Sequence, residues 1–170
     1  MNPARLYTWP DVLRGMVIYA AGDTAAALIL GQFKLTRMLG MMLVGGLVYA
    51  LEIPHYFRWI DRRVPESRSA GATLHRTAYA MLYFNPLWIA RHLLFIHLSA
   101  AEWGAIRWTL VATGSWSWLV NIPLSLAGNF AIQNALPARW RFPGSALFSA
   151  LMAVYYALSA VWFRPGGGGP

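Results

Sequence analysis

Residues 15–32, GMVIYAAGDTAAALILGQ, form an apolar run that contains a single charged side chain, Asp23. A helix needs about 20 mostly apolar residues to cross the hydrocarbon core of a bilayer, and this run is close to that length. Similar runs recur along the chain of 170 residues, of which 58% are hydrophobic and only 12% charged. The sequence therefore predicts an all-α membrane protein.

Five runs are long enough to span a bilayer, and they are predicted at about 15–32, 39–59, 78–98, 110–133 and 144–163. Five spans use about 100 residues and leave only short connections. We therefore expect one bundle of about five transmembrane helices over residues 1–164, followed by a Gly-rich tail at 165–170. Pro137 and Pro143 punctuate the last connection, where a missing donor disfavours helix.

The net charge of +8 fits a membrane better than nucleic acid. Nine Lys and Arg side chains lie in the connections on the side of the amino terminus and four on the other side, with Arg91 inside the third run. Basic residues concentrate on cytoplasmic loops, so the amino terminus is predicted to be cytoplasmic. We expect no nucleic-acid partner, because no soluble basic face is left to present. A bacterial inner membrane is expected, since no cleavable or transit-type leader is visible.

Enzymatic chemistry is not indicated. The chain has no cysteine, which excludes disulfides and thiolate metal sites. It also has no nucleophile elbow, no phosphate-binding loop and no pair of histidines at metal-ligand spacing. The sequence predicts a protein that is not an enzyme and holds no metal.

Polar residues inside the runs are the candidate functional residues. Asp23, Glu52, Arg91 and Asn129 fall in the first, second, third and fourth runs respectively. A charge in hydrocarbon is costly, so these side chains should be paired or face water, and Asp23 or Glu52 is expected to pair with Arg91. Two interpretations stay open: a buried network that fixes helix register, and a water-filled or ion-conducting path.

The third run also contains weak candidates for a cofactor site, His92, His97 and Trp88. A single histidine can ligate haem or chlorophyll but usually makes a hydrogen bond, and buried tryptophans usually serve packing. No cofactor is required by the sequence, while a contact with a pigment, a quinone or a lipid stays open.

The fifth run has small residues at every fourth position, on one helix face: Ser145, Ser149, Ala153 and Ala157. Small residues at this spacing allow two helices to approach closely in lipid. The face is predicted to pack either inside the bundle or against another molecule.

Three stretches, in order, resemble the Mpv17/PMP22 family of small membrane proteins of mitochondria and peroxisomes. They are Gly22-Asp23, then Tyr56-Phe57 with Asp61-Arg62-Arg63-Val64-Pro65, then Pro123 and Asn129-Phe130 followed by Pro137 and Arg139. The resemblance implies a bundle of membrane helices and, as proposed for family members, a small pore. Several polar residues of the family are replaced here by Ala25, Ala80, Ile122 and Leu126.

Two functions follow as hypotheses. The first is a non-catalytic accessory or assembly subunit of a larger respiratory or photosynthetic membrane complex, favoured by the aromatic content, the small-residue face and the missing polar residues. The alternative is a small channel resembling that family, with Asp23, Glu52 and Asn129 near its path. The expected partners are the lipid bilayer and, for the first hypothesis, other membrane subunits.

Overall fold

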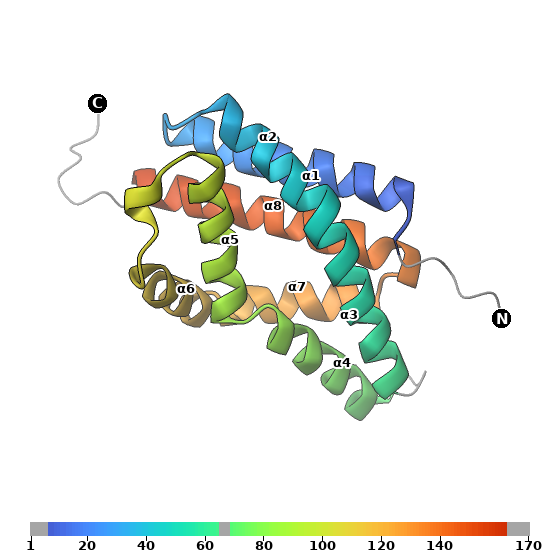
Figure 1. Cartoon of the computed structure of the whole chain (residues 1–170). Coiled ribbons are helices and arrows are strands. Elements are labelled where there is room, and N and C mark those ends of the chain that lie inside the picture. The colour runs from blue at the N-terminus through green and yellow to red at the C-terminus, as the bar shows by residue number, and fades with distance from the viewer. Residues whose placement is uncertain (1–6, 65–68, 163–170) are drawn as a thin grey trace.

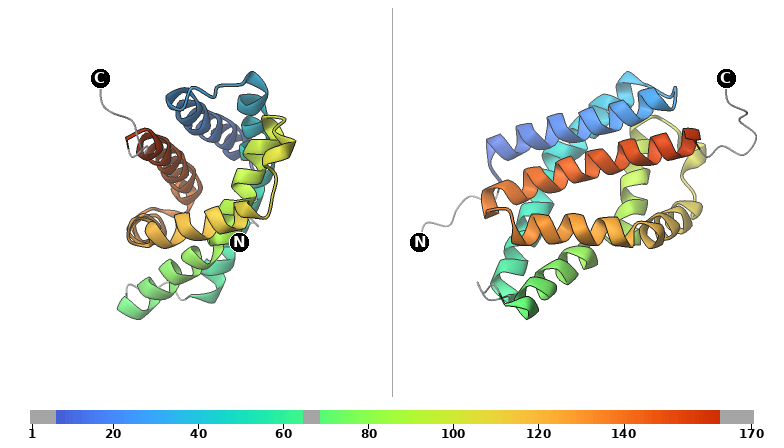
Figure 2. Two further views of the ribbon diagram at one scale, coloured as in Figure 1. Left: turned by 90° about the vertical axis from the view of Figure 1, so that its left-hand side faces the viewer. Right: turned by 180° about the vertical axis from the view of Figure 1, so that it is seen from behind.

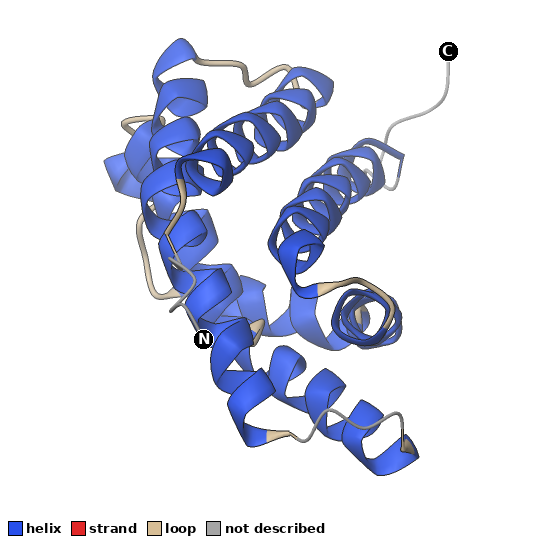
Figure 3. Cartoon of the chain, turned by 90° about the vertical axis from the view of Figure 1, so that its right-hand side faces the viewer, coloured by secondary structure: helices blue, strands red, loops and turns tan. Residues whose placement is uncertain are grey.

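The computed structural model describes residues 7–64 and 69–162, with side chains up to residue 156. This part of the chain consists of helices joined by short loops and turns, with no strand (Figures 1 and 3). Its elements in order are α1 (Trp9–Ile29), α2 (Leu35–Leu43), η1 (Val44–Tyr49), α3 (Ala50–Arg63), α4 (Ala70–Tyr83), α5 (Pro86–Ser99), η2 (Trp103–Ala105), α6 (Thr109–Val120), α7 (Ile122–Asn134) and α8 (Ala138–Trp162). The prediction of an all-α bundle is confirmed.

Two helical stretches in the described residues are long and apolar enough to cross a membrane, Trp9–Ile29 and Leu35–Arg63. They contain most of the first and second predicted spans, but each begins several residues earlier than predicted. The second stretch is continuous because the π-helical turn η1, with its two glycines, joins α2 to α3. Five membrane spans stay a prediction.

The third and fourth predicted spans are each two helices, which corrects the expectation of one continuous helix over 78–98 and over 110–133. The first half, α4, ends at Tyr83. Asn85 then caps the second half, α5, because its side-chain oxygen accepts a hydrogen bond of 3.0 Å from the Trp88 amide. Pro86 then starts α5 at a position that tolerates proline. The fourth run breaks at Asn121, two residues before Pro123. Figure 2 shows that α5 and α6 run across the direction of α1, α7 and α8.

The last helix, α8, begins at Ala138 instead of the predicted residue 144 and contains Pro143. It lies beside α1 and runs parallel to it (Figures 1 and 2). Gly15 packs against Phe142 and Gly22 packs against Ala150, so the residue numbers of both helices rise in the same direction. The backbone of α1 also meets the π-helical turn at Gly15 and Gly45. These glycines are required by the close approach of three backbones.

Apolar packing fills one half of the molecule, around the first halves of α1 and α8 and around α3. The buried residues of this hydrophobic core are Tyr19, Tyr49, Ala50, Ile53, Phe57, Ile60, Val64, Ala72, Ala80, Ile132, Phe142 and Ala146. The second halves of α1 and α8 lie outside this core.

The substitution Gly22→Ala is expected to lower the free energy of unfolding by about 1–3 kcal/mol, the usual cost of overpacking. The added Cβ would lie 2.6 Å from the Cα of Ala150, so α1 and α8 would have to separate. Gly71→Ala in α4 is the control, because its added Cβ meets nothing within 4 Å. Thermal unfolding in detergent should show a loss for the first variant only, and equal midpoints would contradict the close packing.

Candidate functional site: an internal polar cavity

A cavity of about 320 Å³ lies among α1, α2, α5, α6, α7 and α8. Its volume is within the range of sites for small molecules, roughly 300–1,000 Å³. Most of its accessible wall is apolar, and Phe84, Trp88 and Phe148 give part of it aromatic character. The polar residues that line it are Asp23, Arg37, His92, Thr113, Ser117, Ser125, Asn129, Ser145, Ser149 and Tyr156.

Asp23 and Arg37 form a two-pronged ion pair in the wall of this cavity. Arg37 Nε donates to Asp23 Oδ2 at 2.8 Å, and Arg37 Nη2 donates to Asp23 Oδ1 at 2.7 Å. Both residues are buried, with exposed fractions of 4% for Asp23 and 8% for Arg37. Two parallel charge-assisted bonds orient both groups and offset their loss of water.

The short connection between α1 and α2 brings this pair together. Asp23 and Arg37 each lie seven residues from Leu30, which ends α1, so an antiparallel return of the chain places them opposite each other. Sequence reasoning assigned Arg37 to a connection and missed it as a site residue. The equal spacing about the turn is the signal that could have found it.

Arg91 was predicted to pair with either Asp23 or Glu52, and it pairs with Glu52. Arg91 Nη1 donates to Glu52 Oε1 at 2.9 Å. Each side chain is about one-third exposed. Glu52 lies in a separate open groove, so the expectation that it stands near the same path as Asp23 and Asn129 is wrong. The groove is lined by Leu47, Val48, Leu51, Glu52, His55, Tyr56, Trp59 and Tyr83.

Asn129 reaches the cavity from α7 with part of its hydrogen-bonding capacity unused. Its Nδ2 donates to the Ser125 carbonyl at 2.9 Å and contacts the sulfur of Met81 at 3.5 Å. Its Oδ1 is buried and accepts no hydrogen bond from the protein. An unpaired buried amide oxygen costs free energy. Gln133, one turn further on, is also buried with both amide atoms unpaired.

Two of the three cofactor candidates, His92 and Trp88, line the cavity. Their rings stack at 5.4 Å with an angle of 8° between the planes, and His92 Nδ1 is 2.9 Å from the Tyr49 hydroxyl. The Trp88 indole N–H is buried without a protein acceptor. His97 lies apart from them, at the end of α5. The described residues contain no group of three or more His, Asp or Glu side chains that could hold a metal ion.

The small-residue face of α8 points into the bundle. Ser145, Ser149 and Ala153 line the cavity. The side chain of Ala157 lies outside the described residues. The structure thus favours internal placement of this face over contact with another molecule, and it explains the spacing: small side chains leave room for the cavity.

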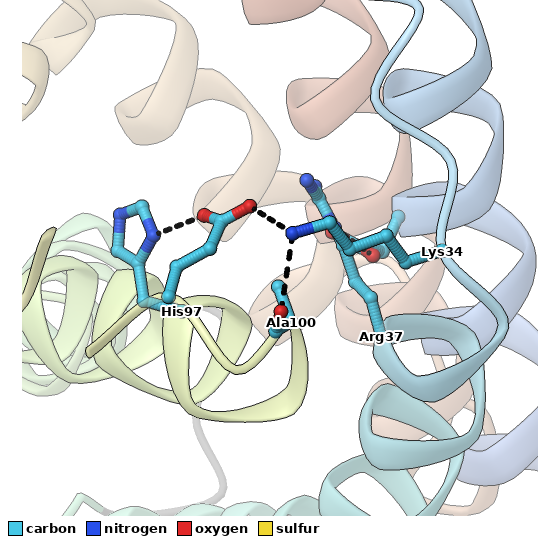
Figure 4. Close-up of polar contacts among 6 residues, drawn as sticks. Lys34, Arg37, His97 and Ala100 are labelled. Atoms are coloured by element: carbon cyan, nitrogen blue, oxygen red, sulfur yellow. Dashed lines mark hydrogen bonds and ion pairs between the residues drawn. The ribbon is translucent and has the colours of Figure 1, made fainter. Parts of the chain in front are cut away.

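A second polar cluster, which we call the latch, joins the α1–α2 connection to the end of α5 (Figure 4). Lys34 Nζ donates to Glu102 Oε1 at 2.8 Å and to the Ala100 carbonyl at 3.1 Å. Glu102 Oε2 lies 2.9 Å from His97 Nδ1. The bonds from Lys34 and then His97 hold the pKa of Glu102 below its ordinary value. The latch is therefore formed when Glu102 is ionised.

The latch should contribute stability only above the acidic range. Because the pKa of Glu102 is lower in the folded protein, its contribution is complete above about pH 4.3, the ordinary Glu pKa, and disappears as the pH falls through the folded value. The midpoint difference between wild type and Glu102→Gln should therefore stay constant above about pH 4.3 and shrink as the pH falls below it. A difference that does not shrink below that pH would contradict an ionised latch. Both partners are partly exposed, so the difference should be small.

In comparisons with known proteins, the chain matches no family model, no curated protein and no solved structure. The resemblance to the Mpv17/PMP22 family stays a prediction from the motifs.

Proposed function

We propose that the protein spans a membrane and conducts a small polar solute through its internal cavity. The observation that carries the proposal is the convergence of the buried Asp23–Arg37 pair and the side chain of Asn129 on one cavity.

The distribution of side chains supports placement in a membrane. Large apolar residues are exposed on the outer faces of the longest helices, among them Val17, Leu28 and Leu151. The charged pair Asp23 and Arg37 and the amides Asn121, Asn129 and Gln133 are buried. Exposed apolar side chains in this number suit a surface that faces lipid or another protein. The proposal includes the amino terminus on the cytoplasmic side of a bacterial inner membrane, as the distribution of basic residues predicts.

An accessory subunit of a larger membrane complex is the second candidate. The Glu52–Arg91 pair lies partly exposed in the outer groove, and a charge pair that faces lipid is costly. A polar contact from another membrane subunit would cover it. The small-residue face no longer supports this candidate, because its described members line the internal cavity.

Two adjacent positions on α7 provide a matched test in a chain that has no native cysteine. Ser125 lines the cavity, whereas Leu126 is exposed on the outer surface. In vesicles, Ser125→Cys is expected to react with a charged, membrane-impermeant thiol reagent, because the proposed path is open to water. Leu126→Cys is expected to react only with a lipid-soluble maleimide.

The reverse pattern would exclude a cavity open to water within a membrane. Rapid reaction of both cysteines with the charged reagent would place the outer face of α7 in water and overturn the membrane proposal. A mild-detergent pull-down separates the two candidates, since a channel needs only this chain. Recovery of a stoichiometric set of other membrane subunits would instead favour the accessory role.

A further inference from the structure

One face of α5 and one face of α8 form two walls of the cavity. On α5 the lining side chains recur at the spacing of a single helix face, at Trp88, Ile89, His92, Leu93 and Ile96. On α8 they recur in the same way, at Ser145, Phe148, Ser149, Met152, Ala153 and Tyr156. Most of the accessible surface of the cavity is apolar. Such a surface favours an apolar occupant, because the transfer of apolar surface out of water is favourable.

Aromatic rings give part of these walls a fixed shape. Trp88 stacks on His92 with 5.4 Å between the ring centroids, and Phe84 meets Trp88 edge to face at 5.1 Å. On the other wall the ring of Phe148 lies against α7, since a Cβ added at Gly128 would be 2.6 Å from it. Rings that hold one another in place are ordered before a ligand enters, which lowers the cost of binding. Because aromatic rings prefer stacked or edge-to-face contact with further rings, these walls favour a ring over an open chain.

The charged groups of the cavity wall are already neutralised. Asp23 and Arg37 bind each other through both carboxylate oxygens and two guanidinium nitrogens. An ionic ligand would have to break these bonds or stay without a counter-charge, and both are costly in a buried site. The walls therefore favour an uncharged occupant.

The volume of about 320 Å³ limits the size of this occupant. An apolar cavity of about 150 Å³ holds one benzene ring, so the space here fits about two fused rings.

We infer that the cavity binds an uncharged aromatic molecule of about two fused rings, of the kind that dissolves in lipid, with its rings between α5 and α8. In the proposed channel the same molecule closes the path, and this second part rests on the proposed function. Binding itself requires only the cavity.

Naphthalene is the probe, and single cysteines report its binding in a chain that has no native cysteine. The whole chain in lipid vesicles is treated with N-ethylmaleimide, a small uncharged thiol reagent. At ten times its dissociation constant, naphthalene should slow the reaction of Ala153→Cys, which lines the cavity, about tenfold. It should not slow Leu151→Cys, which is exposed on the outer surface of the same helix. Ser125→Cys and Leu126→Cys form a second matched pair on α7.

Variants of the wall and of the probe test the chemistry of the site. Phe148→Leu should weaken the protection about two- to tenfold, the range for the loss of one ring contact. Phe130→Leu, on the exposed side of α7, should not weaken it. Naphthalene-2-sulfonate should give no protection because it is charged, and decane should give less because it has no ring. Equal protection by decane would overturn the assignment to a ring, and equal protection by the sulfonate would overturn the assignment to an uncharged ligand.

Entry of urea, a small polar test solute, separates this inference from the proposed function. Naphthalene is expected to stop urea entry through wild type at the concentrations that protect Ala153→Cys. Protection in vesicles that admit no urea would support the binding site and overturn the proposed conduction. Protection with undiminished urea entry would overturn the closure of the path.

Two results would overturn the binding site itself. One is equal slowing of Ala153→Cys and Leu151→Cys by naphthalene, which would place the effect in the lipid. The other is a lack of protection at both cavity cysteines, or their failure to react at all without naphthalene. Urea entry that continues in the presence of naphthalene, with no protection, would leave the proposed channel standing.

Discussion

Arg37→Met is expected to lower the free energy of unfolding by about 3–5 kcal/mol, the usual cost of removing one partner of a buried ion pair. The carboxylate of Asp23 would keep its buried position and lose two bonds of 2.7 and 2.8 Å. The methionine replaces much of the volume of the arginine stem, so the loss reports on charge more than on packing. Unfolding in mixed detergent, followed by helical circular dichroism, measures it.

Two controls isolate the charge effect. Arg14→Met removes the partner of Asp11 at the exposed start of α1, where the pair is separated by 3.3 Å, and should cost at most about 1 kcal/mol. The double variant Asp23→Leu with Arg37→Met should recover most of the stability lost in the single variant, since no unpaired charge is left. If Arg37→Met is no less stable than Arg14→Met, the pair has no structural role.

The sequence predicted the helices where one apolar run forms one helix. The first, second and last runs appear as α1, as α2 to α3 and as α8, although α8 begins six residues earlier than predicted. It could not predict the breaks at Asn85 and Asn121, because both halves of each run are apolar. Hydropathy gives no information on a change in the direction of the helix axis between the two halves. The local signal was present in Asn85-Pro86, where an N-cap residue precedes a proline.

The site was predicted in part for a related reason. Asp23 and Asn129 were recognised because polar groups inside apolar runs are costly, and both line the cavity. Their neighbours across the cavity depend on how the broken helices cross, which periodicity does not give. Glu52 passed the same sequence test as Asp23 but faces the outer groove, since the two lie on helix faces that only the tertiary fold distinguishes.

Ala153→Trp is expected to abolish solute entry into vesicles while the protein stays folded. Ala153 lies in the small-residue face of α8 and lines the cavity, so an indole at this position would occupy the space left for the solute. The cavity is already present, and filling empty space causes less strain than overpacking a dense core. Solute entry should therefore fall to the rate of vesicles without protein, with little change in the unfolding midpoint.

Leu151→Trp, two residues earlier on the same helix, is the matched control. Leu151 is 60% exposed on the outer surface, where an aromatic side chain meets lipid in the proposed arrangement. It introduces the same indole and should leave solute entry unchanged. If both variants reduce entry equally, the effect comes from tryptophan on α8 in general, and the cavity is not the path. If neither reduces it while both fold, solute passes elsewhere and the conducting role of this cavity is wrong.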